Sequence, residues 1–119
     1  MKDIFVTGKN ARPIALGALP ECDFAALREG ILQRVENGGR LAALFGDSCE
    51  DGAVMVYVVI AVDAEGQLAV GRGKLASGTY SALTPDCAQA HCFERELAEQ
   101  FDLAPEGHPW LKPIRYQRP

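Results

Sequence analysis

The chain has 119 residues, 48% hydrophobic and 24% charged, which is the composition of one folded globular domain rather than of a disordered chain. Its net charge of −4 argues against nucleic acid as the main partner, because nucleic-acid-binding surfaces are usually basic. The longest apolar run is about half the length of a membrane-spanning helix, and the N-terminus lacks a signal-peptide pattern, so we expect a cytoplasmic protein.

The N-terminal part predicts little regular structure before a clear helix. Residues 1–20 hold a short apolar stretch, Ile4–Val6, followed by glycines and prolines that prevent a long element. A helix is predicted from Phe24 to Glu36, with Asp23 as its N-cap and Asn37-Gly38-Gly39 as its stop. The apolar residues of this helix recur at intervals of three and four: Phe24, Leu27, Ile31 and Val35.

Three strands are predicted after this helix. Arg40–Phe45 lies between turn-forming segments, and Ala53–Val62 is rich in β-branched residues, as expected for a buried strand. Asp63-Ala64-Glu65-Gly66 predicts a hairpin turn, and Gln67–Leu75 returns as the third strand. We therefore expect an antiparallel meander with one face covered by the first helix.

The third strand contains two glycines in the segment VGRGKL (Val70–Leu75), which has some likeness to a phosphate-binding loop. The segment lacks the full spacing of such loops and precedes no helix that could present its N-terminus to a phosphate. Glycines that relieve a curved or bulged strand are the better interpretation.

A second helix is predicted after a short extended piece around Thr79–Leu83. Thr84-Pro85-Asp86 has the residue types of a helix start, and Leu103 is followed by prolines that exclude further helix. The apolar stripe of this helix consists of Ala90, Phe93, Leu97 and Phe101. The predicted fold of residues 1–119 is thus α+β: a helix on a largely antiparallel meander, a second helix, and an extended proline-rich arm over residues 104–119.

The four cysteines show no C-x2-C spacing, and reduced, mostly buried thiols are the plain interpretation. Cys87 would lie in the first turn of the second helix, where the helix dipole lowers a thiol pKa. An alternative hypothesis is therefore a small redox or metal-binding protein that uses His91, Cys87 and Cys92, or His108. Two ligands at most converge on one helical face, because Cys92 is offset from His91 by about 100°.

The second helix also carries the charged residues Glu94, Arg95, Glu96 and Glu99. Arg95 and Glu99 are spaced as i,i+4 partners, which predicts a solvated face with an ion pair. A catalytic pair of carboxylates would need a pocket that raises one pKa, and the sequence indicates no such pocket.

The segment EGHPWLKP (Glu106–Pro113) predicts a stiff arm. Gly107 permits a positive φ, and the two prolines fix their own φ and favour extended geometry in the residues before them. The arm carries apolar side chains that either pack on their own domain or anchor an interface, and the residues alone leave both open. These side chains are Trp110, Leu111, Ile114 and Tyr116.

Two groups of residues in this region have a recognisable spacing. The first is Glu94-Arg95-Glu96 with Glu99 and Phe101, and the second is Gly107-His108-Pro109 with Leu111. The arrangement is similar to the signature of the 30-kDa subunit of respiratory complex I (NADH dehydrogenase), roughly E-R-E-x-x-D-x-F/Y-G and then G-H-P-x-L-R-R. The likeness covers about residues 20–116.

The chain departs from that signature at several positions. Glu99 stands in place of aspartate, Gln100 in place of a common apolar residue, Asp102 in place of glycine, and Lys112-Pro113 in place of two arginines. The form E-R-E-L-x-E-Q, then P-E-G-H-P-W-L-K-P, more closely resembles the homologous module of membrane-bound, energy-converting nickel–iron hydrogenases of the formate hydrogenlyase type.

The resemblance implies a subunit without catalytic residues or a cofactor of its own. Such a subunit supports the hydrogenase-like large subunit, near the iron–sulfur small subunit, and reaches the cytoplasmic face of the membrane only through its complex. The residues expected to bind the partner are Glu94, Arg95, Glu96, Glu99, Gly107, His108, Pro109, Trp110, Lys112 and Arg115.

Overall fold

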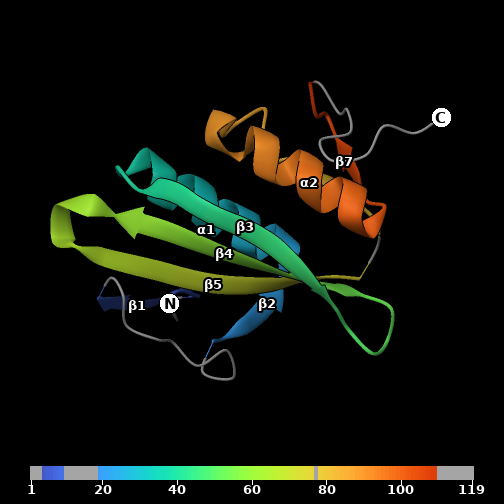
Figure 1. Ribbon diagram of the computed structural model, residues 1–119, viewed down its shortest axis with the longest axis horizontal. Helices are drawn as coiled ribbons and strands as arrows, with labels where there is room; N and C mark the ends of the chain where they lie inside the picture. Colours follow the sequence, from blue (N-terminus) through green and yellow to red (C-terminus); the bar gives the residue numbers. More distant parts are fainter. Residues whose placement is uncertain (1–3, 10–18, 77, 110–119) are drawn as a thin grey trace.

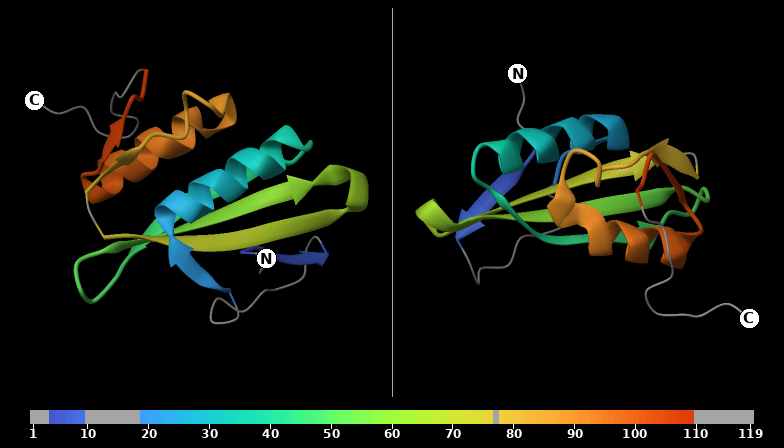
Figure 2. Two further views of the ribbon diagram at one scale, coloured as in Figure 1. Left: turned by 180° about the vertical axis from the view of Figure 1, so that it is seen from behind. Right: turned by 90° about the horizontal axis from the view of Figure 1, so that it is seen from above.

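The computed structural model describes residues 4–9, 19–76 and 78–109. Within these ranges two α-helices lie on the same side of a five-stranded, mostly antiparallel sheet (Figures 1 and 2). A small sheet of two parallel strands adjoins the second helix. The α+β class expected from the sequence is confirmed, while residues 110–119 of the predicted proline-rich arm (104–119) lie outside the described residues.

The centre of the main sheet is the predicted meander of β3 (Arg40–Ser48), β4 (Val54–Val62) and β5 (Gln67–Leu75). β4 and β5 pair in register along their whole length, and a 3-10 turn over Asp63–Glu65 joins them. β3 extends beyond the predicted end at Phe45, because the next residues stay paired with the start of β4. The turn behind β3 is therefore tighter than expected, with Gly52 at a φ of +86°.

Two short strands border β5 on its other edge. β1 (Val6–Lys9) pairs antiparallel with the first half of β5, and β2 (Glu21–Asp23) pairs parallel with the second half. Strands of this length carry little periodic signal of their own, and they are strands here because β5 offers its edge to both.

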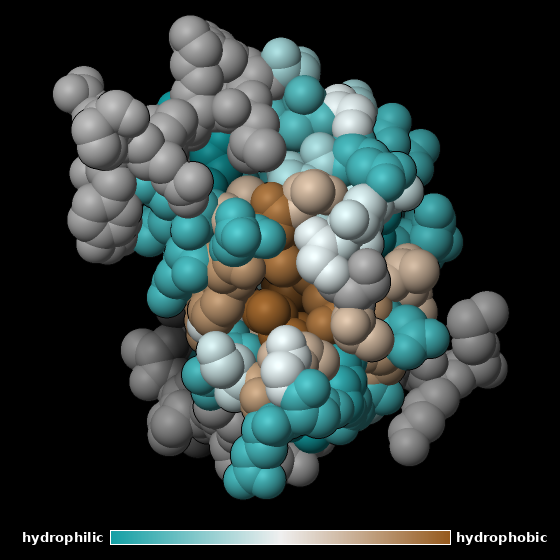
Figure 3. Space-filling view, turned by 90° about the vertical axis from the view of Figure 1, so that its right-hand side faces the viewer, coloured by the Kyte–Doolittle hydropathy of each residue, from teal (hydrophilic) through white to brown (hydrophobic). Residues whose placement is uncertain are grey.

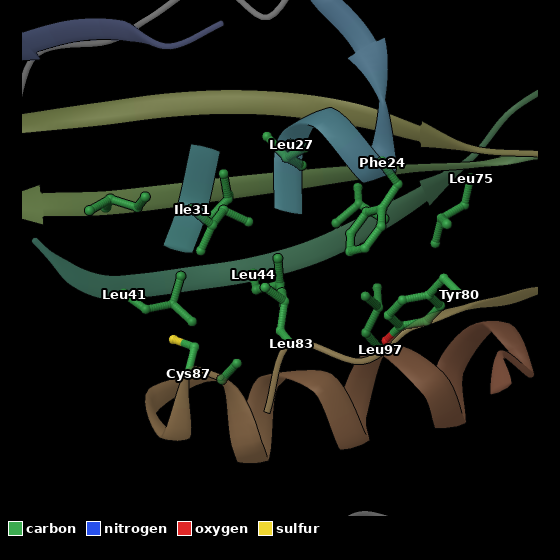
Figure 4. Close-up of a cluster of buried hydrophobic side chains, with 14 of the residues drawn as sticks. Phe24, Leu27, Ile31, Leu41, Leu44, Leu75, Tyr80, Leu83, Cys87 and Leu97 are labelled. Carbon is green, nitrogen blue, oxygen red and sulfur yellow. The ribbon is translucent and has the colours of Figure 1, made fainter. Parts of the chain in front are cut away.

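Helix α1 (Phe24–Glu36) has the predicted bounds and packs on β5. Asp23 occupies the predicted N-cap position, although its side chain makes no capping hydrogen bond. The interior lies between the helices and the sheet, and Figure 4 shows apolar side chains from both helices and the sheet meeting there.

The glycines of β5 allow close approach of α1 rather than a bulge. β5 pairs with β4 without a register shift, and the irregularity of the sheet lies in β3, between Leu41 and Ala43. A Cβ atom at Gly73 would lie 2.9 Å from Cβ of Leu27. Of the predicted curved or bulged strand, the bulge is therefore absent from β5, and the glycines serve helix–sheet packing.

The second helix begins later than predicted. Thr84-Pro85-Asp86 form a turn, η3 (Ala88–Ala90) is a 3-10 turn, and α2 spans His91–Phe101. The turn is closed by hydrogen bonds from the N–H groups of Asp86 and Cys87 to the carbonyl of Leu83. Thr84 is therefore not the N-cap of α2, and its N–H and hydroxyl groups donate to the Glu94 carboxylate instead.

The face of the sheet opposite the helices carries a smaller apolar cluster formed by Leu19, Met55 and Tyr57. Phe45 stacks on Tyr57 at this face and is 47% exposed. No helix in the described ranges is long and apolar enough to cross a membrane.

A Gly73→Val substitution tests the packing role of the β5 glycines. We expect it to lower the free energy of unfolding by about 1–3 kcal/mol, because the added side chain pushes α1 from the sheet. Gly78→Val is the matched control, since no atom lies within 4 Å of the position its Cβ would take. Urea denaturation of both variants measures the difference, and an equal effect at the two positions would contradict this account.

Candidate functional site

A fully buried carboxylate lies at the junction of α2 with the segment before it. Glu94 is 0% exposed, and each of its oxygens accepts two hydrogen bonds. Oε2 accepts from the Tyr80 hydroxyl at 3.1 Å and from the Leu83 N–H at 2.8 Å. Oε1 accepts from the N–H of Thr84 at 3.0 Å and from its hydroxyl at 2.7 Å. We call these residues, together with His91 and His108, the Glu94 cluster.

The Glu94 carboxylate accepts the backbone hydrogen bonds of the turn before α2, in place of a backbone carbonyl. The N–H groups of Leu83 and Thr84 are buried, and a buried N–H needs an acceptor. Thr84, the first residue of the turn, thus binds a side chain in the first turn of α2, which fixes the turn against the helix. Burial and the Glu94 charge raise the pKa of Tyr80, so its hydroxyl stays protonated and donates.

His108 joins the cluster from the C-terminal side. Its Nε2 lies 3.9 Å from Oε1 of Glu94, and its side chain is only 1% exposed. The His91 and His108 rings face each other with their centroids 5.3 Å apart. The start of the arm is therefore held against α2.

The backbone around His108 explains how it reaches α2. β6 (Thr79–Ser81) and β7 (Ala104–Glu106) pair in parallel, and the Ala82 N–H donates to the Glu106 carbonyl at 2.9 Å. Gly107 then adopts a positive φ of +85°, which glycine permits, and turns the chain toward the cluster. The short extended piece predicted around residues 79–83 is confirmed over Thr79–Ser81 as β6, and residues 82–83 lead into the turn.

The structure separates the predicted partner-binding residues into groups. Glu94 is inside the protein, so its assignment to a solvated face is wrong, whereas the side chains of Arg95, Glu96 and Glu99 are half-buried. Gly107 and Pro109 are exposed, and His108 meets Glu94. Three predicted residues lie outside the described ranges: Trp110, Lys112 and Arg115.

The sequence contained a signal for the burial of Glu94. It is four residues after Ala90 and three before Leu97, both buried, so it lies in the same row of the helix as the core side chains. The sequence did not indicate that Tyr80 and Thr84 bind Glu94. The turn that brings them to Glu94 has no periodic pattern of residues from which the contact could be predicted.

The position and the pKa shift of Cys87 both differ from the sequence prediction. Cys87 precedes α2 with extended backbone geometry, so it does not lie in the first turn of a helix. Burial raises the pKa of its thiol, the opposite of the predicted dipole effect, whereas Cys92 is exposed on α2. Among the described residues no three His, Cys, Asp or Glu side chains are placed to hold a metal ion.

No protein-family model and no curated protein matches the chain. The chemistry of the cluster is therefore inferred from its geometry. A carboxylate with four donors and no solvent exposure positions other groups, whereas an acid–base catalyst would need access to a substrate. The Glu94 cluster is a positioning site that joins β6, α2 and the first residues of the arm.

Replacing Glu94 tests this role. Glu94→Ala should lower the free energy of unfolding by about 3 kcal/mol or more, because buried donors lose their acceptor. Glu94→Gln should lose less, since it keeps one acceptor oxygen. Glu36→Ala, at an exposed helix position, is the control and should change stability by less than about 0.5 kcal/mol. Chemical denaturation compares the three, and equal stability of Glu94→Ala and the control would contradict the positioning role.

The thiols of Cys87 and Cys92 should also differ in their reactivity toward an alkylating reagent. We expect iodoacetamide at neutral pH to modify Cys92 readily and Cys87 only after unfolding, because Cys87 is buried and its pKa is raised. Peptide mass spectrometry after timed labelling follows both sites in one sample. Labelling of Cys87 at the rate of Cys92 in the folded protein would contradict the described packing.

Proposed function

We propose that this protein is a non-catalytic docking and assembly subunit of a complex I-like, membrane-associated oxidoreductase. The hydrogenase-like large subunit is its main partner, with the iron–sulfur small subunit nearby. The energy-converting nickel–iron hydrogenase type is favoured over the NADH:quinone type by the form of the motif. The proposal rests on the motif resemblance together with one geometric observation, the meeting of Glu94 and His108.

The contact between Glu94 and His108 supports the proposal because each belongs to a different half of the signature. The glutamate opens E-R-E on α2 and the histidine is the centre of G-H-P, and their side chains lie 3.9 Å apart in the interior. One residue from each half of the motif thus takes part in holding the start of the arm against α2, which supports the proposal.

Holding the arm also favours binding to a partner. The chain up to Pro109 is held in place by β7 and by His108, with Gly107 at the bend between them. A segment with a fixed origin and a stiff backbone loses less conformational freedom when it binds, so more of its contact energy appears as affinity. Glu94 is accordingly a positioning residue, whereas Trp110, Lys112 and Arg115 are proposed to touch the partner.

The polar side chains next to the arm complete the proposed joint. Arg95, Glu96 and Glu99 lie on α2 beside the cluster and are half-buried, so they retain surface for an interface. Half-buried charges at the edge of an interface set register and specificity more than affinity. In this proposal the electrons pass through the neighbouring subunits, and the chain contacts the membrane only through the complex, on its cytoplasmic face.

Purification from the source cell tests the proposal. Affinity-tagged full-length chain should co-purify with a hydrogenase-like large subunit and an iron–sulfur subunit, identified by mass spectrometry. Trp110→Ala should weaken binding to the purified large subunit about 30-fold, or roughly 2 kcal/mol, if Trp110 anchors the interface. Trp110→Phe is the matched control and should retain most of the affinity.

The two outcomes that contradict the proposal are distinct. Partners of an unrelated class in place of the oxidoreductase subunits would overturn the assignment of the complex. The expected partners together with wild-type affinity of Trp110→Ala would leave the complex correct and show that the arm has been misassigned.

A further inference from the structure

A groove opens at one end of the molecule, and no residue of α2 lines it. It lies between the first turns of α1, the end of β5 and strand β6, and its volume is about 510 Å³. Figure 3 faces this end and shows apolar side chains at the bottom of a hollow, with hydrophilic side chains around it. A concave site of this size with an apolar floor is typical of a binding site rather than of an ordinary surface.

Three buried side chains line the deep part of the groove. Phe24 and Tyr80 pack edge to face with their ring centroids 4.9 Å apart, and Leu75 lies beside them (Figure 4). The Tyr80 hydroxyl donates to Glu94, so its ring is held in place from the other side. The floor is therefore rigid and apolar, which suits an aliphatic or aromatic side chain of a ligand.

The positive charges at the groove are already neutralised within the protein. The Arg28 guanidinium is 17% exposed and donates to Asp86 at 2.7 Å and to the Ala82 carbonyl at 3.0 Å. The Lys74 ammonium donates to Asp51 at 2.7 Å. These two side chains close the sides of the groove and offer little charge to an anionic ligand.

The remaining charge at the mouth is acidic. Glu29 is 70% exposed, although one oxygen lies 3.9 Å from Nη1 of Arg28, and Asp23 is exposed at the start of α1 without a side-chain capping bond. A ligand that places a lysine or arginine here gains a charge pair, whereas a phosphate or carboxylate ligand would be repelled.

We propose that this groove binds a short extended peptide segment with an apolar side chain on Phe24, Leu75 and Tyr80 and a basic residue beside Glu29 and Asp23. β6 forms one wall of the groove, and all three of its residues, Thr79, Tyr80 and Ser81, line it. An extended segment can therefore run alongside β6. The binding surface uses residues of α1, β5 and β6 and Asp23 at the end of β2, and the proposal is independent of the oxidoreductase assignment.

Fluorescence anisotropy with the full-length protein tests the proposal. The probe is a pooled set of fluorescein-labelled hexapeptides, Thr-Lys-X-X-Lys-Thr, in which X is Leu, Ile, Val, Met or Phe. The matched pool carries Glu in place of Lys. We expect saturable binding of the Lys pool at least about tenfold tighter than of the Glu pool, and weaker binding at high salt.

Two variants locate the binding. Ala25→Trp fills the groove from an exposed position and should abolish binding. Glu29→Lys should weaken binding of the Lys pool at least about fivefold. Glu36→Lys, two turns further along α1, makes the same charge change away from the groove and should bind as wild type. Circular dichroism checks that each variant is folded.

Several results would overturn the proposal. These are the absence of binding of either pool, equal binding of the Lys and Glu pools, and wild-type affinity of a folded Ala25→Trp variant. An equal loss in Glu29→Lys and Glu36→Lys would also overturn it, since the effect would then come from net charge.

Discussion

The buried Glu94 carboxylate is the constraint on which the C-terminal half of the structure depends. An ionised group inside a protein is costly unless hydrogen bonds replace its hydration. Glu94 meets this need with four donors from Tyr80, Leu83 and Thr84, and each donor is usable only when β6, the turn and α2 hold their observed positions. One side chain thus places three segments relative to one another, and His108 adds the start of the arm.

Tyr80 connects the two surfaces to which we assign binding roles. Its hydroxyl donates to Glu94 inside the cluster that holds the arm, and its ring packs on Phe24 at the floor of the peptide groove. The position of β6 therefore matters to both surfaces. The β6–β7 sheet has only three residue pairs, and it lies between the Glu94 cluster and the groove. Contacts at both sites hold it in position.

The sequence predicted the elements that arise from local patterns and missed those that arise from distant partners. The bounds of α1 and β5 were correct because apolar periodicity and flanking turn residues act within one segment. Thr84 was a suitable N-cap by residue type, yet Glu94 takes its backbone and hydroxyl groups. The resemblance selected Glu94 and His108 as site residues, but with the role of surface contacts. The spacing of Glu94 from Ala90 and Leu97 indicated burial, but its partners came only with the fold, because no local pattern shows which turn will cover a helix.

By itself the sequence determined the α+β class and the antiparallel meander, since β-branched runs and helical spacing restrict the backbone wherever they occur, and at Gly107 it permitted a positive φ. Tertiary structure decided what each side chain does. In the folded protein the β5 glycines allow α1 to approach the sheet closely, and burial raises the pKa of the Cys87 thiol. Glu94, which looked like a surface charge in the sequence, is a buried hydrogen-bond acceptor. Such roles depend on what lies within a few ångströms, and long-range packing sets those neighbours.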